Sequence, residues 1–321
     1  MRVRFWGTRG SLPVALTWRD VRDRLARALV AANGQNLDTV EKAHAFAEQH
    51  LGFSLTHTFG GHTSCVELLP PDAAPDEYFV CDMGSGARPF GEHIAARQGG
   101  RPATIYVFMS HMHWDHIMGF PFFGPAYVRG NNIRIHGCHE ALEHAFRRQQ
   151  DPPSFPVAFS QLAADIEFVH LAADESHELP AVTVTPQLQH HSGDSYGFRF
   201  KSRGKSLVYT TDSEHKLDDH PARRRIVEFF RDADLVIFDA MYSLAEAVSV
   251  KADWGHSSNV VGVELCQMAN ARKLALFHHE PANGDDAIER ILRETRRLEE
   301  LTRGVQRLEV IAAYDGLEIE L

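Results

Sequence analysis

Four side chains that can bind metal ions crowd into six positions of this chain, directly after a strand-like run. The run is Ile105 to Met109, and the sequence Ser110-His111-Met112-His113-Trp114-Asp115-His116 follows it. Each buried imidazole or carboxylate needs a partner, and ordinary core packing does not supply four in so short a segment. A divalent ion does, because neutral histidine is the commonest metal ligand. The fold must therefore place this strand end at a metal site.

The spacing within this segment indicates two ions rather than one. His111 and His113 alternate along an extended or turning backbone, so their side chains point to the same side and can bind one ion. Asp115 and His116, where the chain turns, are then free to bind a second. The competing interpretation is a surface loop with coincidental histidines, and the tight spacing argues against it.

Further candidate ligands follow three other strand-like runs. They are His190-His191 after Val182 to Leu188, Thr211-Asp212 after Leu207 to Tyr209, and His278-His279 after Leu274 to Phe277. Strand ends are the usual location of site residues on an α/β scaffold. Any one of these residues alone would be an ordinary loop residue, but together with the first segment they form a set of five histidines and two aspartates.

Composition excludes several classes of protein. The chain has 321 residues, 44% of them apolar, and a formal net charge of −10. This apolar fraction is typical of a globular core, and no run approaches the roughly 20 apolar residues that cross a bilayer. The acidic balance argues against a nonspecific polyanion binder. The four cysteines form no CxxC pair, which excludes a thiolate zinc site. Met1 to Trp6 enters a strand-like pattern directly, so we expect a cytoplasmic protein.

Short strand-like and helix-like runs alternate from end to end, which predicts the α/β class. No composition shift marks a boundary, so one domain over residues 1–321 is expected. Later helices are expected over His139 to Gln149, Ser257 to Ala269 and Asp285 to Leu298. The expected strands are Val3 to Trp6, Cys65 to Leu69, Tyr78 to Cys81, Ile105 to Met109, Ile133 to His136, Ile166 to Val169, Val182 to Leu188, Tyr196 to Phe200, Ser206 to Tyr209, Leu235 to Phe238, Lys273 to Leu276 and Leu308 to Ala313.

A helical hairpin is predicted to be inserted over residues 14–56. Thr17 with Asp20 can cap a first helix, and Asp38 with Glu41 has the spacing of a capping box for a second. The first helix carries Val21, Leu25 and Leu29 on one face. Three roles stay open for this insertion: a packing element, a lid or a dimer contact.

The histidine pattern resembles the metallo-β-lactamase superfamily. In that family His-x-His-x-Asp-His is followed by an isolated His, an isolated Asp and a final His, and the fold is a four-layer αββα sandwich of two related halves. Further motifs resemble the phosphodiesterase branch, which includes tRNase Z and cyclic-nucleotide phosphodiesterases. They are Gly7-Thr8-Arg9-Gly10-Ser11, Gly60-Gly61-His62-Thr63-Ser64-Cys65, Asp82-Met83-Gly84-Ser85-Gly86, Gly197-Phe198-Arg199, Thr211-Asp212, Asp239-Ala240-Met241-Tyr242 and Gly255-His256-Ser257.

The resemblance implies a ligand for each metal position. One ion lies on His111, His113 and His191, a second on Asp115, His116 and His278, and Asp212 bridges them. His190 and His279 are the alternatives one residue away from His191 and His278. Asp82 is expected to buttress the site. Nitrogen and oxygen ligands favour Zn²⁺ and also suit Mn²⁺ or Fe²⁺.

The resemblance also implies a chemistry. Two divalent ions lower the pKa of a bridging water and clamp a phosphoryl group, so the expected reaction is attack of a metal-bridging hydroxide on a phosphodiester. Asp115 is expected to orient the hydroxide or take its proton. His256 is expected to protonate the leaving oxygen or hold the phosphate, with helix capping as the alternative. Residues expected near the substrate are Thr8, Arg9, Ser64, Ser257 and Tyr242, the last with plain packing as its alternative.

A small phosphodiester such as a cyclic nucleotide is the favoured substrate. The net charge is −10, and the arginine runs 223–225 and 293–297 are interleaved with acidic residues, which disfavours nucleic acid. The alternatives are a tRNase Z-like endoribonuclease, a carboxylic ester, thioester or lactam hydrolase on the same ions, and a metal-binding sensor without catalysis. Asp212 stands against the lactamase alternative, since classical lactamases place a cysteine there. By analogy with dimeric relatives, a homodimer is also expected.

Overall fold

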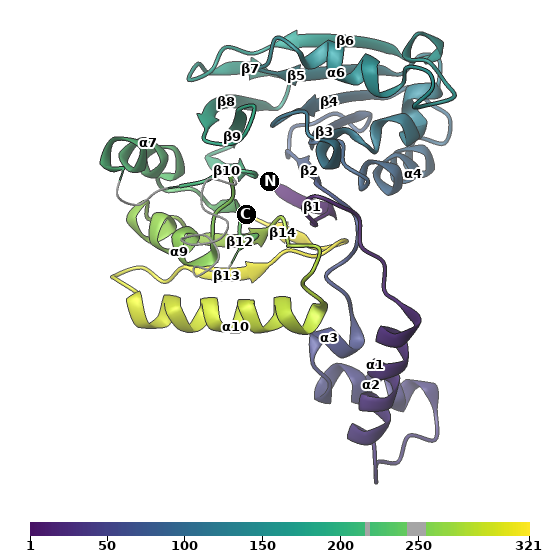
Figure 1. The fold of residues 1–321 in the computed structure, drawn as a ribbon, viewed down its shortest axis with the longest axis vertical. Helices are drawn as coiled ribbons and strands as arrows, with labels where there is room; N and C mark the ends of the chain where they lie inside the picture. Colours follow the sequence, from purple (N-terminus) through teal and green to yellow (C-terminus); the bar gives the residue numbers. More distant parts are fainter. Residues whose placement is uncertain (216–218, 243–254) are drawn as a thin grey trace.

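Two seven-stranded β-sheets organise the chain (Figure 1). The computed structural model describes residues 1–215, 219–242 and 255–321. The first sheet has the order β14-β1-β2-β3-β4-β5-β6, and the second has the order β13-β12-β11-β10-β9-β8-β7. In each sheet four strands pair antiparallel and the last of these begins a parallel run of four. The two sheets therefore repeat one pairing pattern.

The strand bounds agree closely with the sequence pattern, because each of the twelve expected strands is present. The first sheet contains β14 (Glu318–Glu320), β1 (Arg2–Gly7), β2 (Cys65–Leu69), β3 (Glu77–Cys81), β4 (Thr104–Phe108), β5 (Asn132–Gly137) and β6 (Asp165–His170). The second contains β13 (Glu309–Ala312), β12 (Lys273–Phe277), β11 (Leu235–Asp239), β10 (Lys205–Thr210), β9 (Ser195–Ser202), β8 (Val182–Gln189) and β7 (His177–Leu179).

The sheets pack face to face, and strand alternation divides their side chains between two sides. On β4, Tyr106 and Phe108 point into the core between the sheets, where Phe200 and Leu207 of the second sheet meet them. Ile105, the preceding residue, belongs to the core on the outer face. This period of two is what a strand requires when both of its faces are buried.

Helices cover the two outer faces, which completes the four-layer αββα sandwich. On the first sheet they are α4 (Ala87–Gln98) and α6 (Leu142–Gln149), and on the second they are α7 (His220–Phe230), α9 (Asn259–Met268) and α10 (Asp285–Thr302). The sandwich also contains short helical turns: α5 (Trp114–Ile117), η1 (Phe120–Phe122), η2 (Gly124–Tyr127) and η3 (Phe159–Gln161). The predicted fold class is confirmed.

Several elements differ from the expectation. Helix α4 was not predicted because Pro89 and Gly91 interrupt its pattern. Pro89 lies in the first turn, where no hydrogen bond is lost. A Cβ at Gly91 would lie 2.9 Å from Pro125, so close packing there favours glycine. The three-residue strands β7 and β14 are too short to show an alternating apolar pattern in the sequence, and they lie at the sheet edges.

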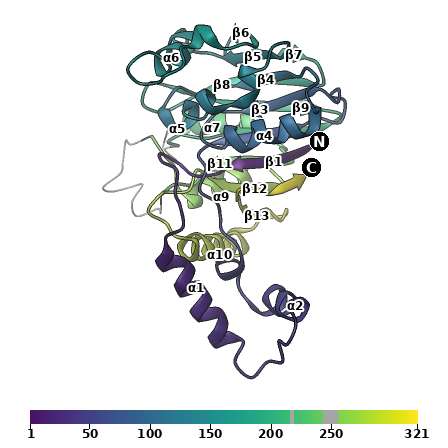
Figure 2. The same ribbon diagram turned by 90° about the vertical axis from the view of Figure 1, so that its right-hand side faces the viewer.

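The segment before β2 forms α1 (Trp18–Ala31), α2 (Val40–His50) and α3 (Phe53–Thr56). Helices α1 and α2 extend away from the sheets beyond α10 (Figures 1 and 2). Thr17 and Asp20 form the expected capping box. The expected cap at Asp38 is wrong: Thr39 caps α2 by accepting from Lys42 N, and Asp38 pairs with the Lys42 ammonium instead.

Among the described residues, the helices are all too short or too polar to cross a membrane.

Candidate metal centre

All the predicted ligands converge at one edge of the sandwich, where strands of both sheets end. His111 and His113 follow β4, and Asp115 and His116 lie on α5. From the second sheet, His191 follows β8, Asp212 follows β10 and His278 follows β12. The site is therefore built from the ends of four strands, and each sheet contributes to it.

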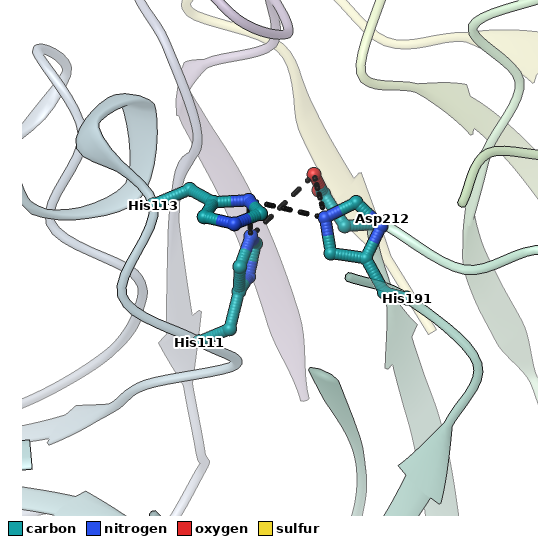
Figure 3. A group of neighbouring side chains, drawn as sticks. All are labelled: His111, His113, His191 and Asp212. Carbon is teal, nitrogen blue, oxygen red and sulfur yellow. Dashed lines mark hydrogen bonds and ion pairs between the residues drawn. The ribbon is translucent and has the colours of Figure 1, made fainter. Parts of the chain in front are cut away.

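The first ligand set consists of His111, His113, His191 and Asp212 (Figure 3). His113 Nδ1 lies 3.0 Å from His111 Nε2 and 3.1 Å from His191 Nε2. Asp212 Oδ2 lies 3.7 Å from both of those Nε2 atoms. The four ligand atoms thus face a common centre.

The second set consists of Asp115, His116, Asp212 and His278, all buried. Asp115 Oδ2 lies 3.3 Å from His116 Nε2 and 3.2 Å from His278 Nε2. Asp212 Oδ1 lies 3.1 Å and 3.2 Å from the same two nitrogens. Asp212 therefore presents one oxygen to each set, as a bridging carboxylate would.

These separations fit tetrahedral coordination. An ion with ligand bonds of about 2.1 Å holds its ligand atoms about 3.4 Å apart, and the separations above run from 3.0 to 3.7 Å. The donors are imidazole nitrogens and carboxylate oxygens, which suit zinc and neighbouring divalent ions. Both sets can hold a divalent metal ion.

The tautomer of His116 points to the same conclusion. Its Nδ1 lies 2.8 Å from Asp82 Oδ2 and donates to it. In the neutral ring, Nε2 then carries a lone pair, and that buried atom has no hydrogen-bond partner among the described residues. The lone pair faces carboxylate oxygens of Asp115 and Asp212, which is repulsive unless a proton or a metal cation lies between them.

Electrostatics favours the ligand-competent forms. Burial lowers the pKa of His111, His113 and His191, so these rings are neutral at pH 7. Burial would raise the pKa of Asp212, but the surrounding imidazoles outweigh it and lower that pKa well below its usual range. Burial also opposes a proton on His116, yet the carboxylates around it raise its pKa strongly. A metal cation would replace that proton.

Asp82 lies behind the second ligand set, where its carboxylate contacts His116. Besides His116, its carboxylate accepts hydrogen bonds from Ser110 N, Ser110 Oγ and the Tyr209 hydroxyl at 2.8, 2.7 and 2.7 Å. Tyr209 belongs to the second sheet, so this one buried carboxylate links both halves to the orientation of a ligand. Such outer partners fix the ring and its tautomer.

Three site residues have backbone conformations that side chains seldom adopt. Asp82, Asp212 and His278 have φ values of 58°, 40° and 58°. Left-handed conformations of this kind are strained for most non-glycine residues and cluster at functional sites. Each of them follows a strand directly or by one residue, so the sharp turn aims the side chain at the centre.

Glycines give the rings room. A Cβ on Gly10 would lie 2.5 Å from the His278 ring, and a Cβ on Gly255 would lie 2.3 Å from His191 Nδ1. The Gly255 carbonyl accepts a hydrogen bond of 2.8 Å from that same Nδ1. Ser11, which follows Gly10, donates its backbone N–H to Asp115 Oδ2 at 2.8 Å. The glycine-rich motifs therefore act through close packing and backbone contacts.

His256 lies beside both ligand sets. Its ring centroid is 5.1 Å from that of His191 and 5.1 Å from that of His278. Its Nδ1 donates to Asp239 Oδ2 at 2.8 Å. Burial disfavours the charged ring, but Asp239 outweighs it and raises the pKa of His256 to about 9. The Asp239 carboxylate therefore favours the protonated form of this ring.

The residues expected near the substrate are less uniform. Thr8 donates to the Phe59 carbonyl and to Asp315, while the Arg9 guanidinium binds the Gly60 and Asn283 carbonyls. Both are buried and serve the fold rather than the ligand sets. Ser64 is buried, and its Oγ has no hydrogen-bond partner among the described residues.

Two further predicted contacts lie close to His256. The ring of Tyr242 packs edge-on against His256 at 5.4 Å. Ser257 Oγ donates to the Ser213 carbonyl at 2.7 Å, so it is occupied within the fold. The following helix starts at Asn259 and is capped by Ser258 rather than by Ser257 or His256.

The role of Asp239 was missed. It ends β11, and its carboxylate receives His256 Nδ1, Ser213 N and Met241 N. The signal was its position at a strand end, which it shares with the ligands. His190 and His279 lie outside both ligand sets. His279 is buried and donates to the Ala313 carbonyl, which makes it part of the core.

This fold and this site define a metal-dependent hydrolase of the metallo-β-lactamase type. The model of the beta-lactamase superfamily domain matches residues 72–279, and the chain belongs to that family.

Comparison with individual proteins agrees. The chain is 22% identical over 281 residues to Ribonuclease Z of Oceanobacillus iheyensis, covering 70% of this chain and 85% of that protein. It is 25% identical over 221 residues to the uncharacterized protein Rv1339 of Mycobacterium tuberculosis, covering 67% and 73%.

Among solved structures, the metallo-beta-lactamase fold protein YhfI of Bacillus subtilis matches with a TM-score of 0.64 and 18% identity, covering 100% of this chain and 99% of that one. A diphosphatase from the PhnP family matches with a TM-score of 0.58 and 17% identity, covering 100% and 97%. At these identities the structural matches establish the fold.

Proposed function

We propose that the protein is a binuclear phosphodiesterase that hydrolyses a small phosphodiester such as a cyclic nucleotide, with zinc as the resident ion. The observation that carries this proposal is the position of His256, which lies beside both ligand sets and is held by Asp239. Its side chain is 10% exposed.

When bound, two divalent ions supply Lewis acidity and a water of lowered pKa. The first would be held by His111, His113 and His191, the second by Asp115, His116 and His278, and Asp212 would serve both. The rest of the chemistry falls to the chain. His256 gives its Nε2 proton to the leaving oxygen, and the hydrogen bond from its Nδ1 to Asp239 fixes the ring.

A phosphodiester is favoured over an acyl substrate because Asp212, which would serve both ions, stands where classical lactamases place a cysteine. His256 can protonate the leaving oxygen of a phosphodiester or of a carboxylic ester, so it does not separate these two substrate classes. The sequence relatives named ribonuclease Z are consistent with phosphodiester chemistry.

A small substrate is favoured over RNA. Arg225 pairs with Asp174, Arg297 pairs with Glu300, and Arg296 donates to the Val310 carbonyl. At least three of the six arginines in the two runs are thus engaged within the protein, which reduces the positive charge that the runs offer to a phosphate backbone. The net charge of −10 acts in the same direction.

The second candidate is a tRNase Z-like endoribonuclease, which the named ribonuclease Z relatives favour. One screen separates the candidates. Protein loaded with Zn²⁺ or Mn²⁺ is offered bis(p-nitrophenyl) phosphate, cyclic mononucleotides, cyclic dinucleotides, a precursor tRNA and a thioester. We expect turnover of the first two classes. Cleavage of the tRNA alone would support the endoribonuclease, and turnover of the thioester alone would overturn phosphodiester chemistry.

A further inference from the structure

A cavity of about 460 Å³ lies next to the metal centre, on the outer side of the second sheet between β8 and α7. We call it the β8 pocket. Its lining includes His190 and Glu214, which stand one residue before the ligand His191 and two residues after the ligand Asp212. Glu214 N donates to the His190 carbonyl at 2.9 Å. The pocket thus lies beside the metal centre.

Two glutamines of β8 line this pocket, and the amide oxygen of each is without a hydrogen-bond donor among the described residues. Gln187 is 8% exposed and Gln189 is 4% exposed. The Oε1 atom of each is buried and accepts no hydrogen bond from any described residue. Gln189 Nε2 donates to Thr210 Oγ1, which fixes that amide in place.

Buried amide oxygens without a donor are costly, and native proteins contain few of them. Here two stand at positions i and i+2, which places them on one face of the strand. A ligand that brings N–H donors into the pocket would satisfy both. The arrangement therefore points to a ligand with hydrogen-bond donors.

The side of the pocket opposite the glutamines is mixed. Ile226 of α7 and Leu265 of α9 are buried and apolar, and Arg223 and Arg225 of α7 line the pocket beside them. An apolar patch facing two amides suits a flat ring with donors on its edge. Glutamine amides recognise adenine edges in this manner, and the volume lies within the range of small-ligand sites.

We propose that the β8 pocket binds the amino-substituted base of a nucleotide whose phosphate lies at the ligand sets. This inference rests on the proposed phosphodiesterase function and adds specificity to it. Gln189 is two residues from His191, and two residues of extended chain span at most about 7 Å. A nucleoside joined to its phosphate can bridge that distance.

The first test compares substrates that differ in one group. Metal-loaded protein is assayed with cyclic AMP, with cyclic IMP, which has a carbonyl in place of the amino group, and with bis(p-nitrophenyl) phosphate, which has no base. Gln187→Met keeps the side-chain length and removes the amide. We expect it to raise KM for cyclic AMP roughly tenfold, the effect of about one hydrogen bond, and to leave the base-free substrate unchanged.

Two further variants are matched to this one. Gln187→Glu keeps an acceptor oxygen and should restore the preference for cyclic AMP over cyclic IMP. Thr183→Val lies on the same strand but lines a different cavity, so its kinetic constants should equal those of the wild type. An equal loss on all three substrates for Gln187→Met, or no loss at all, would overturn the β8 pocket as a base site.

A binding measurement separates this inference from the proposed function. Calorimetry with adenosine and inosine needs neither ions nor hydrolysis. We expect adenosine to bind the wild type and Gln187→Glu. Adenosine should bind Gln187→Met at least several-fold more weakly, and inosine should bind the wild type more weakly by a similar factor. Adenosine binding without hydrolysis of any phosphodiester would refute the function and keep the pocket. Hydrolysis of bis(p-nitrophenyl) phosphate without adenosine binding would do the reverse.

Discussion

The metal centre and helix α1 both depart from the usual rule that polar side chains are exposed and apolar side chains are buried. The metal centre buries a set of imidazoles and carboxylates, whereas no residue of α1 is buried and its apolar side chains face outward. Buried polar groups and exposed apolar rows are the informative departures from normal burial. The buried polar groups of the metal centre need a counter-charge, which a bound cation supplies. The exposed apolar row of α1 is the kind of surface that another protein molecule covers.

The exposed row of α1 consists of Trp18, Val21, Leu25 and Leu29, with Leu25 59% exposed. Arg24 and Arg27, on another face of the same helix, pair with Asp285 and Asp286 at the start of α10. Ion pairs thus tie the helix to the body while the apolar row stays uncovered. Its spacing of three and four residues is that of a helix-pairing seam. We assign the expected homodimer, which stays a prediction, to this surface.

The largest effect is expected at the shared carboxylate. Asp212→Asn keeps a residue that tolerates the left-handed backbone but weakens both ligand sets. Turnover should fall by at least about a thousandfold, since both ions assist the reaction, and metal content by elemental analysis should fall with it. His190→Ala, outside the ligand sets, should keep both ions. Full metal content in Asp212→Asn would contradict the bridging assignment.

His256→Ala should separate chemistry from metal binding. Loss of a general acid typically costs roughly a hundredfold to ten-thousandfold in turnover, while elemental analysis should still find two ions per chain. Asp239→Asn should show the same pattern with a smaller loss. If metal content falls in parallel with turnover, His256 is a structural residue.

An intermediate effect is expected behind the site. Asp82→Asn keeps an acceptor for His116 and the left-handed backbone but removes the charge. Outer partners of this kind are worth about ten- to a hundredfold in metal affinity, which a competition titration with a chelator would measure. Tyr209→Phe removes one of the hydrogen bonds to Asp82 and serves as the milder comparison. Unchanged metal affinity in both variants would show that Asp82 does not support metal binding.

His136 tests whether every buried histidine matters for function. It stacks on Phe108 with centroids 5.0 Å apart, its Nδ1 donates to the Val107 carbonyl, and burial lowers its pKa to about 4. The unfolded chain takes up a proton on this ring as pH falls through about 6.5, but the folded chain does so only near pH 4. Its contribution to stability is therefore present above pH 6.5 and lost on acidification towards pH 4.

His136→Phe should remove this acid sensitivity. Between pH 7.5 and 4.5 the wild type should lose up to about 2 to 3 kcal/mol more free energy of unfolding than the variant. Urea unfolding at the two pH values measures the difference. Activity at pH 7.5 should match that of the wild type. A large loss of activity at that pH would mean that His136, like the buried histidines of the metal centre, contributes to function.

The smallest effect on activity is expected on α1. Leu25→Asp should convert a dimer to a monomer in sedimentation experiments, with turnover of bis(p-nitrophenyl) phosphate within about twofold of the wild type, because the row lies apart from the ligand sets. Val30→Asp replaces another exposed apolar residue of α1 that stands off the row, and should leave the dimer intact. A wild type that is monomeric at micromolar concentration would refute this surface.

The sequence predicts the strands and the ligand residues well because both depend on local patterns. Alternating apolar residues mark each buried strand, and ligand-type residues stand directly at strand ends. Arg9 shows where such patterns fail. It lies in a glycine-rich turn typical of a phosphate contact, yet its partners Asp285 and Asn283 are more than 270 residues away in the chain. Only the tertiary structure shows that this cation is already neutralised.

The same limit applies to Asp239 and to α1. The pairing of Asp239 with His256 depends on how the ends of β11 and α9 meet, which no local spacing encodes. The apolar row of α1 looks like a packing face in sequence, since periodicity indicates a surface to be covered but not what covers it.

Each ligand set draws on both sheets: Asp212 and His191 or His278 approach from one side, and the segment after β4 approaches from the other. Neither half of the sandwich can hold an ion alone, so cation uptake and the docking of the halves are coupled equilibria. A chelator would therefore lower the stability of the whole fold as well as the activity. Hydrolysis can begin only in a chain whose two halves are already packed together.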